Sequence, residues 1–260
     1  MMKSGYNAIR RNRNIGTARQ GHRRNNTMKI PYVCHYERIW WENLAPHTLL
    51  KRHISHREIT FIVEQTREDC RHACTVDDIC HLLSLVPASD LESLETIVMR
   101  QSTRKQWLLD PAWGRLAYSA DLGHPGKKTR RLGPAVFLEA VNPETVWKWS
   151  RSLGPEDSLE VERLKTDGHI VEDTGKLLLF HSTLESVRAT QLYRTLPHEI
   201  GHWVDWLEEV VRPMRNSSGS YELLSDRYFA RSKQERELFA HQYADALRKR
   251  LVSQGQIPFV

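Results

Sequence analysis

The stretch "LPHEIGHWVDW", residues 196–206, holds two histidines four positions apart, with a glutamate directly after the first. On an α-helix, residues four apart are rotated by about 40° and lie one turn along the axis, so His198 and His202 can present both imidazoles to one metal ion. Glu199 is rotated by about 100° from His198, where its carboxylate can reach a water on that ion. The alternative is an ordinary helix, rich in histidine and tryptophan, whose two histidines happen to align.

Zinc chemistry gives this spacing its meaning. A catalytic zinc ion takes three protein ligands and leaves its fourth position to water. The ion lowers the pKa of that water to about 7, and Glu199 would take the proton as the hydroxide attacks a carbonyl. The sequence therefore has to supply a third ligand.

Two acids that follow on the same helix are poor third ligands. Asp205 lies on the face of His198 and His202, but a rigid helix holds its carboxylate too far along the axis to complete a tetrahedral site. A hydrogen bond to a ligand suits Asp205 better. Glu208 comes ten residues after His198 without the glycine that would turn the chain between them, so we expect a solvated helix residue.

The last helix offers a better third ligand. The sequence "SKQE" predicts that Ser232 caps a helix running to about Leu251, with Glu235 reaching back to the cap. Glu237 lies about 40° from the centre of the apolar stripe of this helix, and a carboxylate on a buried face needs a partner. A zinc ion would supply one, so Glu237 is the predicted third ligand. The stripe consists of Ala240, Ala244, Leu247 and Leu251.

These two helices resemble the gluzincin metallopeptidases. "HEIGH" is followed after a loop by "ERELFAHQYADAL", and the pattern is most similar to the ImmA/IrrE-type group, whose second helix reads E-x-x-A-N-x-F-A. The resemblance covers residues 180–250. It implies His198, His202 and Glu237 as ligands of one zinc ion and Glu199 as the general base. The corresponding positions here are Glu237, Ala240, His241, Tyr243 and Ala244.

The resemblance also carries expectations beyond the ligands. A small Ala240 would let the two helices approach closely, and a small sheet over the active helix would offer an edge strand to an extended peptide. His241 stands where that group has asparagine, which leaves open what orients the first histidine. A hydrolase of this kind needs a donor for the oxyanion, and His241, Tyr228 and Tyr221 are the candidates. His241 could equally bond a ligand carboxylate or lie on the helix surface.

The remaining pattern predicts an α+β protein. Strand-like segments at 95–102, 114–120 and 134–141 alternate with turn-rich stretches, and residues 168–182 read as a hairpin turning at 173–175. Together with the resemblance, they predict a zincin-like domain over 93–260, with a small mixed sheet over the HExxH helix and a C-terminal glutamate-bearing helix.

The helices are predicted from apolar spacing and from the capping residues, prolines and glycines at their ends. Apolar spacing indicates a helical region over 30–92, in which Thr75 caps a helix that ends at Val86-Pro87. A helix is expected over 142–154, from an Asn142 cap to a Gly154 stop. From Ser182 or Thr183 the pattern is helical to Val211, with a kink or a fresh start at Pro197 and a stop at Pro213.

Composition describes a globular chain with a basic end. The 260 residues are 40% hydrophobic and 27% charged, with no apolar run long enough for a membrane span and no secretory signal. Residues 1–29 carry eight basic side chains and no acid, which leaves a net charge of −2 on the other 231 residues, since the chain totals +6. We expect this tail to be disordered. It is either a solvated leader, or an upstream start before Met28, or a weak contact for nucleic acid.

Cysteine and tryptophan give weaker signals. Cys70, Cys74 and Cys80 lie near His72 and His81, but their spacing is not a standard zinc knuckle. Buried thiols, with Cys70 and Cys74 on the core face of a helix, are the simpler interpretation. The tryptophan pairs are expected to pack inside the protein, although those beside the motif could wall a substrate cleft: Trp40 and Trp41, Trp147 and Trp149, Trp203 and Trp206.

These observations lead to one functional prediction and two alternatives. The prediction is a cytoplasmic, single-zinc metallopeptidase that cuts a peptide or protein substrate. The first alternative is a regulatory or binding protein that keeps the fold and the zinc without turnover. The second is a peptidase that acts on nucleic-acid-bound partners, with residues 1–29 making the nucleic-acid contact.

Overall fold

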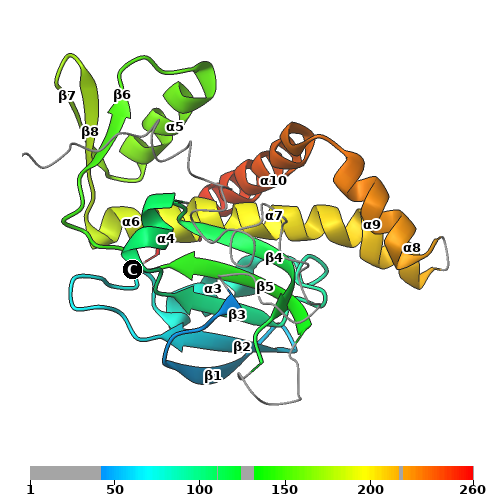
Figure 1. Cartoon of the computed structure of the whole chain (residues 1–260). Helices are drawn as coiled ribbons and strands as arrows, with labels where there is room; N and C mark the ends of the chain where they lie inside the picture. The colour runs from blue at the N-terminus through cyan, green and yellow to red at the C-terminus, as the bar shows by residue number, and fades with distance from the viewer. Residues whose placement is uncertain (1–41, 110, 124–131, 217–218, 260) are drawn as a thin grey trace, which may run out of the picture. The chain divides into compact units, whose positions relative to one another are not determined.

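The computed structural model describes residues 42–109, 111–123, 132–216 and 219–259, so the predicted basic tail and Trp40 and Trp41 lie outside the described residues. The described chain is of mixed α+β class, as predicted, with one five-stranded sheet, one three-stranded sheet and several helices (Figure 1). The strands of the larger sheet are β1 (His47–Ile54), β2 (Arg57–Glu64), β3 (Thr96–Arg100), β4 (Gly114–Asp121) and β5 (Leu132–Glu139).

The larger sheet is mixed, with strand order β1-β2-β3-β5-β4. Strands β2, β3 and β5 run parallel, and β1 and β4 are antiparallel strands at its two edges. The central strand β3, "TIVMR", is buried along its whole length because both faces of the sheet are covered. Ile97 and Met99 face the main core with the helices, whereas Val98 faces a smaller cluster with Phe137.

The N-terminal part of this sheet corrects the predicted helical region. Residues 47–64 form two strands, joined by a tight turn in which Ser55 and His56 both have positive φ, 48° and 67°. The run Ile59–Val63 is apolar and rich in β-branched residues, which favours a strand where a short run fits either period. The Thr75 capping box and the helix end at Val86 are confirmed in α3 (Val76–Leu85). Because β2 pairs with β3, the sheet crosses the expected boundary at residue 92.

The motif lies in one long helical run of five segments. Thr183, one of the two predicted caps, begins it. The two π-helical segments, η3 and η4, each end two residues before a proline, Pro197 or Pro213, whose ring crowds the carbonyl four residues earlier. The widened turns relieve that crowding, so the helix is not broken at Pro197 and continues past Pro213. The segments are α6 (Leu184–Thr190), η3 (Gln191–Thr195), α7 (Leu196–Trp206), η4 (Leu207–Val211) and α8 (Arg212–Arg215).

Between β5 and α6 the chain builds a small lobe, called here the α5 lobe, over residues 142–183. Its hairpin turns at 173–175, as predicted, and Gly175 has a φ of 82°. The helix predicted over 142–154 is wrong, because Asn142 instead closes a turn onto Glu144 and Gly154 precedes a helix rather than ending one. The elements of the lobe are β6 (Trp147–Ser150), α5 (Pro155–Thr166), β7 (Ile170–Asp173) and β8 (Leu177–His181).

The C-terminal part contains α9 (Tyr221–Ala230) and α10 (Lys233–Ser253). The capping box of Ser232 with Glu235 and the burial of the predicted apolar stripe are confirmed in α10. Helix α9 was not predicted, and it carries two of the oxyanion candidates, Tyr221 and Tyr228. Helix α10 packs against α7, and α4 (Arg104–Leu109) completes the described helices (Figure 1). Within the described residues, no helix is both long and apolar enough to cross a membrane.

Two of the described cysteines and four of the described tryptophans named above are packing residues. Cys70 and Cys74 are buried, as predicted, although neither lies on a helix. Cys70 accepts a hydrogen bond from Arg67, Cys74 lies 3.6 Å from the amide oxygen of Gln191, and burial raises the pKa of both thiols. The tryptophans beside the motif are buried, and those of β6 pack in the α5 lobe: Trp203 and Trp206, Trp147 and Trp149.

Candidate metal centre

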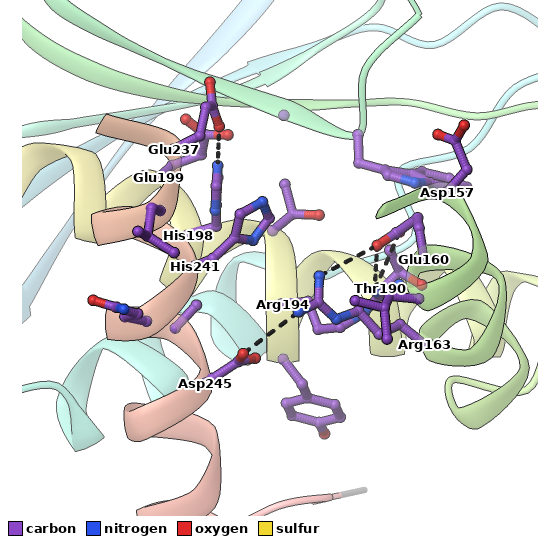
Figure 2. A pocket seen from close by; sticks show the side chains of 18 of the residues that line it. Asp157, Glu160, Arg163, Thr190, Arg194, His198, Glu199, Glu237, His241 and Asp245 are labelled. Atoms are coloured by element: carbon purple, nitrogen blue, oxygen red, sulfur yellow. Dashed lines mark hydrogen bonds and ion pairs between the residues drawn. The ribbon is translucent and has the colours of Figure 1, made fainter. Parts of the chain in front are cut away.

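Helices α7 and α10 bring together the three predicted metal ligands. The Nε2 atoms of His198 and His202 lie 3.3 and 3.5 Å from the same oxygen, Oε2, of Glu237. The three candidate ligand atoms all lie within 4.8 Å of one another, and within the described parts of the chain no other group of His, Cys, Asp or Glu meets this criterion. Figure 2 shows Glu237 reaching His198 from the neighbouring helix.

The residues present fit a zinc ion. Two ligands at about 2.05 Å from a tetrahedral zinc lie about 3.3 Å apart, close to the two distances measured here. Two imidazole nitrogens and one carboxylate oxygen are a donor set that zinc accepts. Hydrogen bonding to the two imidazoles holds the pKa of Glu237 well below its usual range. The carboxylate is therefore deprotonated, which is the form that binds a metal ion.

The imidazoles are oriented by packing. Among the described residues, neither Nδ1 atom of His198 and His202 has a hydrogen-bond partner, although both are buried. The ring of His198 instead contacts that of His202 edge-on, at 4.7 Å between ring centres, and that of His241 in a tilted arrangement, at 4.4 Å. His241 therefore contacts the first ligand through its ring rather than through a hydrogen bond.

A glycine between the two histidines lets the helices meet. A Cβ on Gly201 would lie 2.9 Å from both the Cα and the carbonyl oxygen of Ala240, and 3.1 Å from the Cβ of Tyr243. The expected small residue, Ala240, is thus matched by Gly201, which the sequence analysis did not single out. The signal was present, because Gly201 directly precedes His202 inside the motif. This close approach brings Glu237 within reach of both imidazoles.

Glu199 lies between the metal ligands and the sheet. Its side chain is buried and accepts a hydrogen bond from the backbone of Leu116, which belongs to edge strand β4. Burial raises the pKa of Glu199, and the nearby charges of His198 and His202 oppose that rise. A carboxyl group with a raised pKa next to a metal site can take up and release a proton.

Three further residues were predicted to assist the metal site. One of them lines the cavity beside the candidate ligands, and the other two do not. His241 lines the same cavity as the metal ligands, and its pKa is lowered by burial and by the charge of His198. Asp205 is instead paired with Arg231 at 2.9 and 3.0 Å, so it does not hold a histidine as predicted. Tyr228 is buried with its hydroxyl 3.0 Å from that of Tyr118, and does not line the cavity.

The acids rejected as ligands take the places expected of them. Glu208 is half exposed and lies 3.7 Å from Arg212, as a solvated helix residue should. Glu235 accepts the backbone N–H of Ser232 in the capping box, away from the metal ligands. Tyr221, the remaining oxyanion candidate, is half exposed on α9 and packs against Trp206.

A cavity of about 1070 Å³ extends from the metal ligands between the α5 lobe and α10 (Figure 2). None of its more distant residues was predicted from the sequence. Arg194 and Asp245 could have been found, since Arg194 precedes His198 by four positions in one helical run and Asp245 follows Glu237 by eight positions on the last helix. The others lie on elements whose proximity cannot be read from the sequence. Residues lining the cavity beyond the ligands include Trp113, Leu159, Glu160, Arg163, Arg194 and Asp245.

Comparisons with known proteins add no relative to this description. Protein-family models, curated proteins and solved structures were each compared with the chain, and none of the three comparisons gives a match.

Proposed function

We propose that this protein is a zinc-dependent metallopeptidase that holds one zinc ion with His198, His202 and Glu237. The observation that carries the proposal is the convergence of two imidazole Nε2 atoms on one carboxylate oxygen, at 3.3 and 3.5 Å. Two features support it: the buried Glu199 beside the ligands and the sequence resemblance to the gluzincin metallopeptidases. The mixed sheet, with an antiparallel edge strand next to the motif helix, is compatible with a zincin-like fold.

The surrounding residues have distinct tasks in peptide hydrolysis. Zinc, when bound, supplies Lewis-acid chemistry that acidifies water and polarises a carbonyl. Glu199 takes the proton from the attacking water and passes it to the leaving amine. Its hydrogen bond to Leu116 places Glu199 beside edge strand β4, where an extended peptide can pair with the sheet. His241, at 4.4 Å from the ring of His198, is the proposed donor to the oxyanion.

The first test is metal content, measured by plasma mass spectrometry on the wild type, Glu237→Ala and Glu235→Ala. We expect about one zinc per chain in the wild type, because catalytic zinc sites of this type hold a single ion. Glu237→Ala should lose it, and Glu235→Ala should keep it, since Glu235 lies on the same helix but caps its first turn. A wild type that takes up no zinc after reconstitution would refute the metal centre.

The second test separates metal binding from turnover. Glu199→Gln keeps the size of the side chain and removes its basicity, so we expect full zinc occupancy with loss of peptide cleavage by at least about a hundredfold. Cleavage of an unstructured protein such as casein, followed by mass spectrometry of the products, provides the measurement. Equal cleavage by Glu199→Gln would exclude Glu199 as the base. A zinc-loaded wild type that cleaves nothing would favour the alternative of a binding or regulatory protein.

A further inference from the structure

Two arginines line the end of the cavity away from the candidate ligands, and they differ in how closely they are paired with acidic side chains. Arg194 is bound closely, with Nε 2.5 Å from Asp167 and one terminal nitrogen 3.2 Å from both carboxylate oxygens of Glu160. Arg163 is bound loosely, because its guanidinium group lies 3.5 Å from Asp245 and 3.8 Å from Glu160. Figure 2 shows Arg163 and Asp245 meeting across the cavity, one from α5 and the other from α10.

The position of Arg163 relates it to the reaction centre. Asp245 follows Glu237 by eight residues on α10, which is about 12 Å along a helix. An extended peptide covers about 3.3 Å per residue, so this distance corresponds to three or four residues of substrate. A peptide that leaves the metal ligands along the cavity therefore meets Arg163 within that length.

The loose pair can exchange partners at little cost. The side chains of Arg163 and Asp245 are 34% and 65% exposed, and ion pairs of this exposure contribute little to stability. A guanidinium group binds a carboxylate most strongly through two parallel hydrogen bonds, which Asp245 does not provide at 3.5 Å. The nearby acid Glu160 is already held by Arg194 at shorter distances.

We propose that Arg163 anchors a carboxylate of the peptide substrate three or four residues from the scissile bond, and that Asp245 occupies this anchor in the free protein. The peptide nature of the ligand rests on the proposed function. The carboxylate has two sources, the C-terminus of a short substrate or an Asp or Glu side chain within a longer one. Both present the same planar group to Arg163, and the test below separates them.

The test measures peptide binding to the zinc-loaded Glu199→Gln protein by fluorescence anisotropy. The probes are labelled octapeptide mixtures, randomised over uncharged residues, in three forms: a free C-terminal carboxylate, a C-terminal amide, and a C-terminal amide with one internal glutamate. We expect one carboxylate form to bind about tenfold more tightly than the plain amide, as a charge-assisted hydrogen bond gives. Which form gains identifies the source of the carboxylate.

Substitutions of Arg163 and of Asp245 should change the preference for a carboxylate in opposite directions. Arg163→Gln should abolish the carboxylate preference, whereas Asp245→Asn should strengthen it by about threefold, because a competing carboxylate is removed. Asp245→Asn should have no further effect in an Arg163→Gln background. The matched control is Arg151→Gln, an arginine of the same lobe that pairs with Asp173 outside the cavity. A preference that survives Arg163→Gln, weaker binding in Asp245→Asn, tighter binding in Arg163→Gln, or no peptide binding at all would overturn the anchor.

Zinc content is measured on every protein after incubation with zinc, and cleavage is measured on the parent protein, so the two proposals fail separately. A carboxylate preference that depends on Arg163, in a chain that takes up no zinc or whose parent cleaves nothing, would support carboxylate binding by Arg163 and refute the peptidase. Zinc and cleavage without such a preference would support the peptidase and refute the anchor.

Discussion

Glu237 approaches the two imidazoles from a second helix, and its side chain is the most exposed of the three ligands, at 38% against 17% and 13%. Its position therefore depends on how closely α10 packs on α7. The contact that sets this spacing is made by Gly201 and Ala240, where the backbones of the two helices meet. Metal binding should respond to a change in this contact even though neither residue touches the ion.

Gly201→Ala tests the spacing of the helices. The added methyl would lie 2.9 Å from backbone atoms of Ala240, which cannot rotate away, so α10 must move outward and carry Glu237 with it. Overpacking costs about 1–3 kcal/mol, and the better helix propensity of alanine returns about 1 kcal/mol. We expect a small loss in the free energy of unfolding and zinc affinity at least about tenfold weaker, measured by denaturant unfolding and competition with a chelator.

Gly133→Ala is the control for that substitution, because its added methyl would meet nothing within 4 Å. It should leave zinc affinity unchanged. If Gly201→Ala bound zinc as tightly as the wild type, the close approach of the helices would not be what positions Glu237.

The three proposed ligands could be predicted from the sequence because each depends on local geometry. His198 and His202 are related by one helical turn, and Glu237 was distinguished from Glu235 by its place beside the apolar stripe. The roles expected of Asp205 and Tyr228 depended on tertiary neighbours, and the structure gives both residues other partners. Arg163 carries no local signal, since its relation to the site exists only across the cavity.

At the scale of elements, η3 connects the motif helix to the sheet through one buried side chain. The amide nitrogen of Gln191 donates to the carbonyl oxygens of Trp113, at 3.1 Å, and Glu139, at 2.8 Å. Trp113 directly precedes β4, and Glu139 ends β5. The start of the edge strand is thereby tied to the helix that carries the histidines.

Gln191→Leu should remove this tie. It would remove both hydrogen bonds, but the carbonyl of Trp113 keeps the backbone N–H of Glu139 at 3.0 Å, so the carbonyl of Glu139 is the one left without this donor, at a cost of about 1–3 kcal/mol. We expect the free energy of unfolding to fall by about 1–3 kcal/mol in a urea titration. Gln254→Leu, an exposed position at the end of α10, should change it by less than about 0.5 kcal/mol. Comparable effects at the two positions would show that the hydrogen bonds of Gln191 contribute little.

The elements that were predicted correctly from the sequence have strong capping signals at their ends. The elements that were missed do not. Capping boxes at Thr75 and Ser232 placed α3 and α10 to within two residues. In 142–154, Asn142 and Pro143 imitate a helix start, but alternation of Trp147 and Trp149 across β6 decides the outcome through packing against Phe180. Helix α9 has only the single serine cap Ser220 and no capping box, so the sequence marks its start weakly.

At the scale of the described molecule, the α5 lobe and the motif helix are joined by a buried polar network. His169 lies 2.9 Å from Ser182 on one side of its ring and 2.9 Å from Thr190 on the other. The hydroxyl of Thr190 in turn donates a hydrogen bond to Asp167, and Asp167 also accepts one from Nε of Arg194. The wall of the cavity is thus fastened to the helical run that carries the metal ligands, and the opposite wall, α10, contributes Glu237.

A bound zinc ion would connect these parts further, so its removal should lower thermal stability. An ion that binds only the folded chain stabilises it by RT ln(1 + [Zn]/Kd), about 2.7 kcal/mol when free zinc is a hundredfold above Kd. For a domain of this size, that energy corresponds to about 5–10 °C in Tm. We expect chelation to lower the Tm of the wild type by this amount in a calorimetric scan, and readdition of zinc to restore it.

The same scan on Glu237→Ala separates this linkage from any general effect of the chelator. That variant lacks a ligand, so its Tm should not respond to chelation, while Glu235→Ala should respond as the wild type does. Because the ligands come from α7 and α10, the stabilisation should extend to both helices and appear as slower amide hydrogen exchange across their contact at Gly201 and Ala240. A wild type shown to contain zinc, yet with a Tm indifferent to its removal, would mean that the unfolded chain binds zinc as tightly as the folded one, and that the packing of α7 and α10 does not create the site.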